Sequence, residues 1–427
     1  MKQPSNLFSY KSLKIIFLGL LMCLSSSCKK QTQKTITNHK VVTAKDILGN
    51  PNYQAICYGG YRKNSREIQP TVAQLKEDLL ILAAMNIKVV RTYNVHLAHA
   101  SNVLKAISEL KKQDPNFEMY VMLGAWIDCQ NAWTDLEKNH DVESKRNAIE
   151  IDEAVRLATK YPEIVKIIAV GNEAMVKWAE EYFVQPNVIL KWVNHLQQLK
   201  KDNKLSKDLW ITSSDDFASW GGLDDTYKIK DLEDLVKAVD YVSMHTYPFH
   251  NTHYNPEFWK IPNHQSNLPK TDLTDAAMNR AVLFAKNQYN SVKKYVHSIS
   301  PNKPVHIGET GWASSSDGFY GNEGSKAADQ YKQAFYYNAM REWTNKEEIS
   351  CFFFEAFDEP WKDSGNSSGS ENHFGILTAY GKAKYVLWDE VDNRSFENLN
   401  RNGISITKTF DGNKEELMQS VLTPPKQ

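Results

Sequence analysis

Short apolar runs alternate with amphipathic stretches along most of this chain, beginning near residue 52. The amphipathic stretches carry apolar residues at three- and four-residue spacing, which is typical of helices packed on a sheet. The apolar runs predict eight strands: Gln54–Gly59, Ile87–Tyr93, Glu118–Trp126, Val165–Glu173, Leu209–Ser214, Tyr241–Tyr247, Pro304–Thr310 and Ser350–Phe357. The stretches between them predict helices: Thr71–Met85, Ser101–Lys112, Ala148–Lys160, Val188–Lys200, Leu273–His297 and Ser325–Trp343. This alternation indicates βα units around a parallel sheet.

Eight such units close into a (β/α)8 TIM barrel, an α/β fold of ~250 residues. The chain has 427 residues, so we expect a single barrel domain with enlarged loops after the sixth and eighth strands. These loops are Pro248–Lys270 and Asp358–His373. The second loop is rich in Gly and Ser, which indicates that it is mobile or becomes ordered on a ligand.

The N-terminal residues have the order of a secretory signal peptide, with Lys residues, an apolar stretch and small residues before Cys28. The apolar stretch is shorter than the ~20 residues that a membrane-spanning helix needs. The segment resembles the lipobox of bacterial lipoproteins, in which the Cys is lipidated, although Ser25 replaces the usual aliphatic residue. Cleavage without a lipid is the alternative. We predict an exported protein with its lipid at Cys28, anchored to the bacterial outer membrane on the periplasmic side, because no acidic run follows Cys28.

These observations divide the chain into four parts. Residues 1–27 form the lipoprotein signal peptide, residues 28–48 a polar tether, and residues 49–398 the barrel. Residues 399–427 form a C-terminal extension to which the sequence assigns no role.

Composition and charge exclude some classes of protein. Lys and Arg together number 51, as do Asp and Glu, so the chain has no overall field to attract nucleic acid. Cleavage before Cys28 leaves three further Cys residues, Cys57, Cys129 and Cys351. An odd number argues against a disulfide framework even in an oxidising compartment.

Two Glu residues end long apolar strands, in the sequences Val170-Gly171-Asn172-Glu173 and Ile307-Gly308-Glu309. The fourth and seventh strands of an eight-stranded barrel face each other across the mouth where catalytic residues gather. Glycoside cleavage needs such a pair, one carboxyl protonated and one ionised. Arg91 and Tyr247 would hold the charge of Glu309, the nucleophile, and Glu173 would be the acid/base. The alternative is that each Glu is only a strand-end carboxylate satisfied by a neighbouring donor.

The two motifs Ala169–Glu173 and Ile307–Trp312 resemble the acid/base and nucleophile motifs of glycoside hydrolase family 17. That family comprises β-1,3-glucanases and related glucosyltransferases on a (β/α)8 barrel of clan A. Further similarity lies at Ile56–Gly59, Val90–Tyr93 and Phe354–Lys362. The resemblance extends over roughly residues 54–380, nearly the whole mature chain.

The resemblance implies roles for further residues. Asn172 is expected to bond the sugar 2-hydroxyl, and Tyr247 to donate to Glu309. Aromatic rings at strand ends are candidate sugar platforms, because the axial hydrogens of glucose present an apolar face. The full predicted substrate-binding set is Tyr58, Arg91, Tyr93, Trp126, Asn172, Tyr247, Trp312, Glu359, Trp361, Lys362 and Glu371.

We therefore predict a monomeric retaining β-glucan hydrolase that cleaves β-1,3 bonds of laminarin-type glucan by double displacement and needs no cofactor. Two alternatives remain: a glucosyltransferase that uses the same residues, and a non-catalytic glycan-binding lipoprotein. Endo or exo action stays open. We predict no metal site, because His245, His250 and His253 match no compact ligand spacing. The pair Asp215-Asp216 could bind calcium, but such pairs in loops are usually solvated caps.

Overall fold

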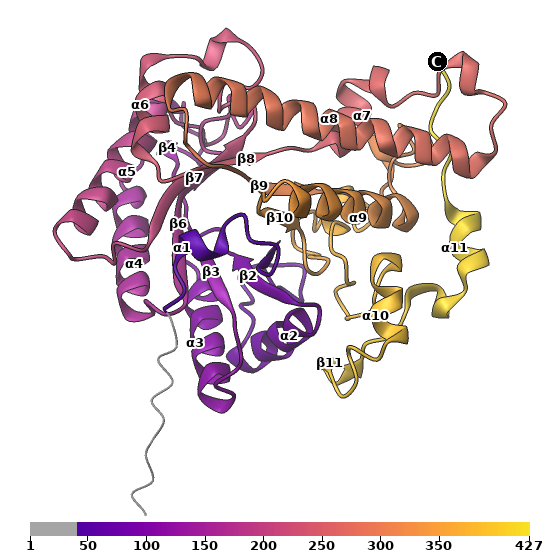
Figure 1. Cartoon of the computed structure of the whole chain (residues 1–427), viewed down its shortest axis with the longest axis horizontal. Coiled ribbons are helices and arrows are strands. Elements are labelled where there is room, and N and C mark those ends of the chain that lie inside the picture. Colours follow the sequence, from indigo (N-terminus) through magenta and orange to yellow (C-terminus); the bar gives the residue numbers. More distant parts are fainter. Residues whose placement is uncertain (1–40) are drawn as a thin grey trace, which may run out of the picture. The chain divides into compact units, whose positions relative to one another are not determined.

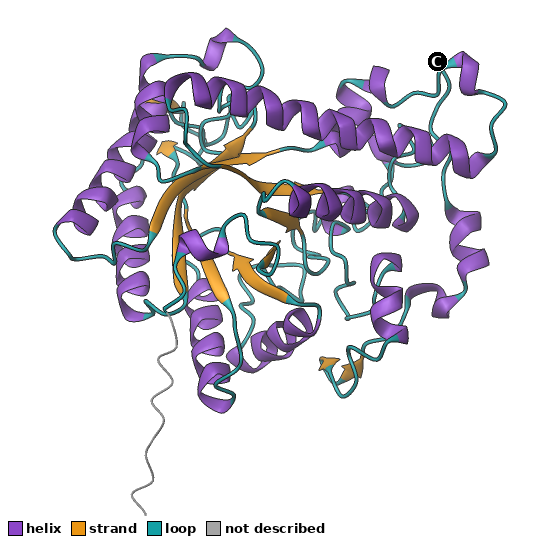
Figure 2. Ribbon diagram, in the orientation of Figure 1, coloured by secondary structure: helices purple, strands orange, loops and turns teal. Residues whose placement is uncertain are grey.

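The computed structural model describes residues 41–427, and all of the elements below lie in this unit. Eight parallel strands close into a barrel in the order β1-β10-β9-β8-β7-β6-β3-β2, and they form the ring at the centre of the unit in Figure 2. The predicted (β/α)8 fold is confirmed. The barrel strands are β1 (Gln54–Cys57), β2 (Ile87–Arg91), β3 (Tyr120–Ala125), β6 (Val165–Asn172), β7 (Trp210–Asp216), β8 (Val242–His245), β9 (Val305–Gly311) and β10 (Cys351–Phe354).

All eight predicted strands coincide with barrel strands to within a few residues. Continuous apolar runs form strands here because helices cover one face of the sheet and the packed barrel interior covers the other. In β6, Ile167, Ile168, Ala169 and Val170 are all at most 1% exposed. This strand carries the Asn-Glu pair to the mouth of the barrel.

The helices lie outside the ring of strands (Figure 1). The longer ones are α2 (Val72–Ala84), α3 (Ala98–Gln113), α4 (Arg146–Lys160), α5 (Pro186–Lys201), α6 (Lys230–Ala238), α8 (Lys270–Ile299) and α9 (Gln330–Lys346). Helix α6 was not among the predicted helices. Helix α9 begins at Gln330 and not at Ser325, because the Asp329 side chain accepts a hydrogen bond from the backbone N–H of Lys332 and caps the helix there.

The predicted enlarged loops carry short elements of their own. After β8 come α7 (Pro248–Tyr254), η2 (Pro256–Phe258) and η3 (Asn263–Gln265), and after β9 comes η4 (Gly318–Tyr320). The loop after β10 contains η5 (Ser370–Asn372). A further insertion follows β3, where β4 (Cys129–Gln130) pairs antiparallel with β5 (Asn139–Glu143). All these insertions lie beyond the carboxyl ends of barrel strands, where they can shape a site.

The fold extends beyond residues 49–398 at both ends. Helix α1 (Ala44–Ile47) has a Thr43 capping box, and both of its terminal residues are buried. The C-terminal segment adds η6 (Tyr385–Leu387), α10 (Trp388–Asp392), the hairpin β11 (Asn400–Arg401) and β12 (Ile404–Ser405), η7 (Thr409–Gly412) and α11 (Lys414–Ser420). The predicted signal peptide, Cys28 and the tether up to residue 40 lie outside the described residues.

The residues after 399 are tied to distant parts of the barrel. Arg401 is 0% exposed and donates to Asp78 at 2.8 Å. The carbonyl of Leu422 accepts a hydrogen bond from Lys332, and the N–H of Gln427 donates to the carbonyl of Ile261. The C-terminal extension therefore belongs to the folded unit. Within residues 41–427, no helix is both long and apolar enough to cross a bilayer.

Candidate active site

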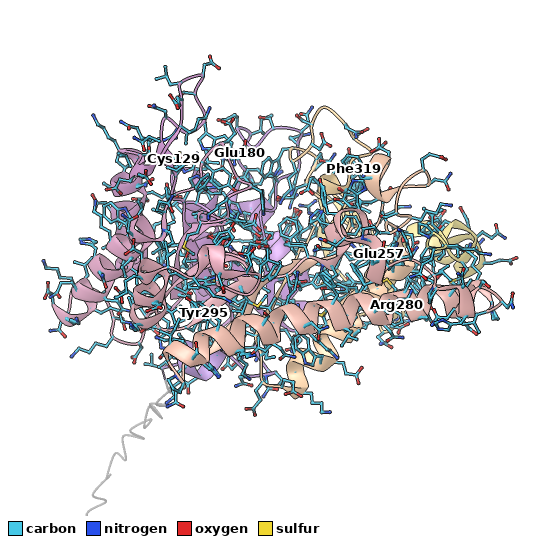
Figure 3. All side chains as sticks on the ribbon, turned by 90° about the horizontal axis from the view of Figure 1, so that it is seen from above. Cys129, Glu180, Glu257, Arg280, Tyr295 and Phe319 are labelled. Atoms are coloured by element: carbon cyan, nitrogen blue, oxygen red, sulfur yellow. The ribbon has the colours of Figure 1, made fainter. Side chains whose placement is uncertain are left out.

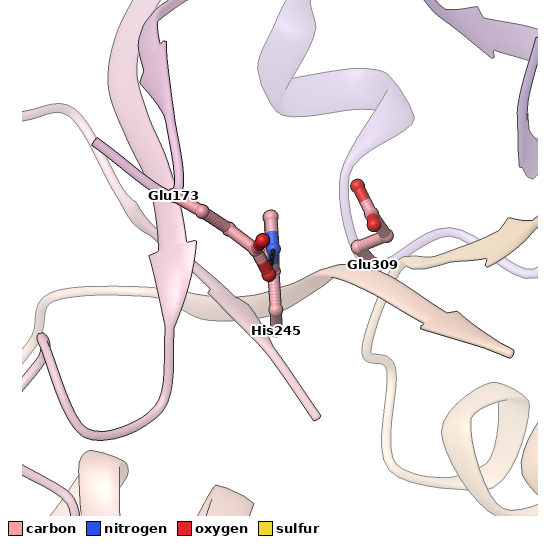
Figure 4. A group of neighbouring side chains, drawn as sticks. All are labelled: Glu173, His245 and Glu309. Atoms are coloured by element: carbon pink, nitrogen blue, oxygen red, sulfur yellow. Dashed lines mark hydrogen bonds and ion pairs between the residues drawn. The ribbon is translucent and has the colours of Figure 1, made fainter. Parts of the chain in front are cut away.

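Glu173 and Glu309 face each other at the carboxyl end of the barrel (Figure 4). One oxygen of each carboxylate and one ring nitrogen of His245 all lie within 4.8 Å of one another. Retaining glycosidases hold their two carboxyl groups ~5–5.5 Å apart, whereas inverting enzymes need ~6.5–9.5 Å to admit a water. The separation in this protein therefore fits the retaining arrangement.

The backbone turns sharply where β6 delivers Glu173. Gly171 has a φ of 81°, and Glu173 itself has a φ of 46°, in the left-handed region that side chains other than glycine seldom adopt. The pairing register of β6 with β7 shifts between Ala169 and Asn172, and the N–H of Glu173 donates to the carbonyl of Ser214 at 3.0 Å. Strain of this kind costs about 1–3 kcal/mol and is typical of functional sites.

Glu309 is surrounded by side-chain hydrogen-bond donors at the mouth of the barrel. Its Oε2 accepts hydrogen bonds from Arg91 at 2.7 Å and from Tyr93 at 3.0 Å, and its Oε1 accepts one from Tyr247 at 2.6 Å. Burial alone would raise the pKa of Glu309, but the charge of His245, which is present only when that ring is protonated in the acid range, the charge of Arg91 and the hydrogen bond from Tyr247 lower it below its usual value. Glu309 is therefore ionised, as a nucleophile must be.

Steric crowding explains why the residue before Glu309 is a glycine. A Cβ at Gly308 would lie 2.0 Å from the Oγ of Ser243 and 2.4 Å from the Oγ of Ser214. These two hydroxyls, 2.9 Å apart, lie against Gly308, directly before Glu309 in the sequence. Any larger residue would displace them or shift Glu309.

Arg91 joins the two halves of the site. Its Nη1 donates to Glu309 and to the carbonyl of Gly308, while its Nη2 donates to the Oδ1 of Asn172 at 2.5 Å. Because Arg can only donate, this contact assigns the Oδ1 end of the Asn172 amide. The Nδ2 end of Asn172 is thereby left as the donor for a ligand, as the role of binding a sugar hydroxyl requires.

Glu173 has the opposite electrostatic setting. Burial, and then the charge of Glu309, raise the pKa of Glu173 to about 8. Its Oε1 lies 3.0 Å from the Nδ1 of His245. Glu173 therefore holds a proton at neutral pH, which is the state required of a general acid.

His245 is also a member of the site, although the sequence indicated only a residue at the end of the sixth strand and no role beside Glu173. Its Nε2 lies 3.2 Å from Arg91 and 2.8 Å from the Oγ of Ser214. Since Arg91 can only donate, Nε2 is the acceptor and Nδ1 carries the proton, which it donates to Glu173. Burial lowers the pKa of His245 to about 4, so the ring is neutral near neutral pH. A His at the end of an apolar strand gives no sequence signal of this role.

The three groups of Figure 4 have donor atoms of the kinds that bind metals. The guanidinium of Arg91 already stands 2.7 Å from Glu309 and 3.2 Å from His245. A second cation at the same place would be repelled, and Glu173 would first have to lose its proton. The cluster is thus suited to moving a proton between a carboxyl group and a substrate.

A second cluster of charges follows β10. The Nζ of Lys362 lies 3.6 Å from Glu355 and 3.7 Å from Glu359, and 4.0 Å from the centre of the Phe354 ring. Burial raises the pKa of Glu355, Glu359 and Glu371, and the charge of Lys362 opposes this rise. The structure thus brings Glu359, Lys362 and Glu371 together, as the sequence suggested, and adds Glu355.

Glu359 organises this region through its hydrogen bonds. It accepts from the backbone N–H of Tyr61 at 3.2 Å and from the Nε1 of Trp361 at 3.1 Å. A Cβ at Gly59 would lie 2.0 Å from its Oε1, so any larger residue there would push the Glu359 carboxylate aside. Glu359 therefore fixes the position of the partly exposed Trp361.

Two residues predicted to bind substrate lie beneath the site and not in it. Tyr58 is 0% exposed, and its hydroxyl donates to Asp78 at 3.0 Å. Trp312 is also 0% exposed and donates its Nε1–H to the carbonyl of Ala327. Neither ring has a face open to a sugar, so the prediction of substrate contact is wrong for both. The other predicted aromatic residues, Tyr93, Trp126, Tyr247 and Trp361, are partly exposed.

Comparison with known proteins identifies relatives of the whole fold. Residues 55–375 match a family model described as the BtgE/BtgC glycoside hydrolase domain. The crystal structure of an endo-laminarinase from Formosa Hel1_33_131 is 64% identical in sequence, superposes with a TM-score of 0.90 and covers 90% of this chain and 98% of its own.

More distant relatives are fungal. The "Probable glucan endo-1,3-beta-glucosidase btgC" of Aspergillus oryzae is 24% identical over 80% of this chain, which spans only 44% of that protein's length. A glycoside hydrolase family 17 β-1,3-glucanosyltransferase from Rhizomucor miehei is 20% identical with a TM-score of 0.52, covering 77% of this chain and 94% of its own. At that identity the likeness concerns the fold alone.

Proposed function

The chain belongs to the BtgE/BtgC glycoside hydrolase family, and from this premise we propose that it is a retaining endo-β-1,3-glucanase of glycoside hydrolase family 17 acting on laminarin-type glucan. The observation that carries the proposal is the pair Glu173 and Glu309, with oxygens within 4.8 Å and pKa values shifted in opposite directions. The high identity to an endo-laminarinase supports the choice of substrate and of endo action.

In the first step, the carboxylate of Glu309 attacks the anomeric carbon while Glu173 gives its proton to the departing glycosidic oxygen. The C–O bond to the leaving chain breaks as the bond to Glu309 forms, which produces a glucosyl-enzyme. Arg91 holds the nucleophile in place through a 2.7 Å hydrogen bond. Asn172 binds the 2-hydroxyl of the reacting sugar, a contact that strengthens as positive charge develops on the ring.

In the second step, the ionised Glu173 takes a proton from water, and the water oxygen displaces Glu309. Once the first step has removed the charge of Glu309, the electrostatic cause that helped to raise the pKa of Glu173 disappears. Glu173 is then better able to remain ionised and act as a base. His245 donates to Glu173 in both steps and holds it toward the substrate.

The test is digestion of laminarin by the purified protein, followed by separation of the products over time. We expect oligosaccharides of several lengths early in the reaction, as internal cleavage requires. Release of single glucose units from the start would contradict endo action. In a parallel digestion of a single laminari-oligosaccharide, products longer than that substrate would favour the alternative, a glucosyltransferase. Binding without any product would favour a non-catalytic glycan-binding protein.

We also propose that the protein is a monomer exported as a lipoprotein, with its lipid on Cys28 and its barrel on the periplasmic side of the outer membrane. The signal-like segment and the lipobox-like residues before Cys28 support this proposal. In a bacterial host, the wild-type protein should sediment with outer membranes, and the Cys28→Ser variant should be found in the soluble periplasmic fraction. Equal membrane association of both proteins would contradict the lipid anchor.

A further inference from the structure

A pocket of about 510 Å³ opens among the loops that follow β1, β2 and β3. Its volume lies within the ~300–1,000 Å³ that is usual for ligand sites. The residues that line it follow β1, β2 and β3 or belong to α4, and include Arg66, Asn94, His96, Trp126, Trp133 and Glu150. In Figure 3, Cys129, in the hairpin that carries part of this wall, lies on the same side of the molecule as Glu180 and Phe319, which follow other barrel strands. The pocket is thus part of the catalytic face.

Aromatic rings form one side of this pocket. The ring centres of Trp126 and Trp133 are 6.3 Å apart, and each lies 5.1 Å from the ring centre of Tyr182. Trp133 stacks on Tyr182 at an interplanar angle of 19° and is nevertheless 52% exposed. Its φ of 64° is unusual for a bulky residue. The hairpin loop therefore holds one face of the Trp133 indole open over the pocket. Exposure of this apolar ring to water is unfavourable by itself.

The polar groups of the pocket are fixed by each other. Glu150 accepts hydrogen bonds from the backbone N–H groups of Val95 and Trp126, and its Oε2 lies 3.0 Å from His96. Arg146 forms an ion pair with Asp128 at 2.7 Å. Because Asp128 is already paired with Arg146 and Glu150 already accepts hydrogen bonds from two backbone N–H groups, neither carboxylate is free to bind a cation, and the pocket suits a neutral polar ligand. Aromatic faces combined with such donors suit a sugar, which has one apolar face and a rim of hydroxyls.

The pocket adjoins residues that surround the catalytic pair at two points. Tyr93 donates to Glu309, and the next residue, Asn94, lines the pocket. Arg66 also lines it and lies 5.1 Å from the centre of the Trp361 ring. A chain whose reacting sugar sits at Glu309 can therefore extend into the pocket without leaving the surface.

We propose that this pocket is a distal subsite that binds a glucosyl unit of a linear β-1,3-glucan chain, separated from the bond that is cut. The proposal rests on the proposed glucanase function. The subsite would raise the catalytic efficiency only for chains long enough to reach Trp133, so that the enzyme selects long glucans over short oligosaccharides.

The experiment compares kcat/KM across a series of laminari-oligosaccharides, from the shortest that the wild-type protein cleaves upward. In the wild type, kcat/KM should rise when the chain becomes long enough to fill the pocket. Trp133→Ala should lower kcat/KM for the long chains by about tenfold, equivalent to about 1.4 kcal/mol, and leave the shortest substrate unchanged. Trp133→Phe should retain most of the gain with length. Tyr380→Ala, which removes an exposed ring outside the pocket, is the matched control.

A length profile that Trp133→Ala leaves unchanged, or an equal loss at every length, would overturn the subsite. Calorimetric binding in a Glu309→Gln background tests it independently of catalysis. There, Trp133→Ala should weaken binding of long oligosaccharides by about tenfold and leave that of the shortest unaltered, and equal affinities in both proteins would reject the proposal. If the wild type cleaves none of the oligosaccharides, the proposed function fails while this binding comparison still decides the subsite.

Discussion

The Nη1 of Arg91 lies 2.7 Å from the Oε2 of Glu309, and the two side chains are 1% and 8% exposed. The same guanidinium reaches Asn172 through its other terminal nitrogen. One buried cation therefore keeps Glu309, the proposed nucleophile, ionised and orients the Asn172 amide that is proposed to meet the sugar.

Replacement of Arg91 tests this coupling. In Arg91→Lys a single ammonium cannot reproduce the planar fork that contacts both Glu309 and Asn172. We expect kcat to fall by about 100-fold or more, the loss typical when a preorganised donor is removed. Steady-state kinetics on laminarin would measure it, with thermal unfolding to verify the fold. Lys88→Arg at the opposite end of β2 is the control, and wild-type kcat in Arg91→Lys would contradict the account.

The pH dependence follows from the two carboxyl groups. The pKa of Glu309 lies below its usual value, so Glu309 gains a proton and stops attacking only when the pH falls into the acid range. The pKa of Glu173 is about 8, so Glu173 loses the catalytic proton as the pH rises through that value. We expect a bell-shaped profile of kcat/KM with its basic limb near pH 8.

The Glu173→Gln variant assigns the basic limb. Assayed on an aryl glycoside whose leaving group needs no proton, it should keep the acid limb and lose the basic one. A basic limb that persists at the same pH in Glu173→Gln would mean that another group supplies the proton.

Chemical rescue separates the roles of the two Glu residues. In Glu173→Ala, azide can enter the space of the missing carboxyl and attack the glucosyl-enzyme formed from an activated aryl glycoside. The expected product is a β-glucosyl azide, identified by proton NMR. Glu309→Ala is the matched control, because azide would then replace the nucleophile and give the α-azide. The same anomer from both variants would contradict the assignment.

The C-terminal segment should contribute to stability. Arg401 and Asp78 are both 0% exposed, and Arg62 is a second partner of Asp78 at 2.8 Å. Breaking a buried ion pair costs 3–5 kcal/mol as an order of magnitude. Since Arg62 remains, we expect Arg401→Met to lower the free energy of unfolding by about 3 kcal/mol, at the low end of that range.

Denaturant unfolding would measure this loss. The double variant Arg401→Met, Asp78→Asn should recover part of it, because the buried carboxylate that has lost one of its two cations is then absent, while Arg62 keeps its ion pair with Glu77. If Arg401→Met alone were as stable as the wild type, the ion pair between the C-terminal segment and the barrel would contribute nothing to stability.

The strands, and the meeting of Glu173 and Glu309 at the mouth of the barrel, could be predicted because their signals are local. Each barrel strand is a continuous apolar run, and the polar residues that end β6 and β9 must emerge at the same edge of a parallel barrel. Glu173 and Glu309 follow from that rule with no knowledge of side-chain orientation.

The predictions for Trp312 and Tyr58 were wrong because they depended on the direction in which each side chain points. Trp312 stands three residues after Glu309, yet its ring points into the layer between barrel and helices, 5.4 Å from Phe249 and 5.6 Å from Trp259. Tyr58 likewise turns toward Asp78. Adjacency in sequence does not tell on which side of the strand a ring lies once the strand has ended.

Other features depend on partners far away in the sequence. The role of His245 requires the left-handed turn at Glu173, 72 residues earlier. The C-terminal segment contacts Asp78, which is 323 residues distant from Arg401. No periodicity records such contacts, because they arise only when the barrel closes.

The most direct test of the central claim is the anomeric form of the first products. Proton NMR, recorded within the first minutes of laminarin or laminari-oligosaccharide hydrolysis, distinguishes the two anomers before they equilibrate. A catalytic pair with oxygens within 4.8 Å, in which Glu309 forms a glucosyl-enzyme, predicts that the new reducing ends are β. New reducing ends that are α from the start would show inversion and contradict the role of Glu309 as nucleophile.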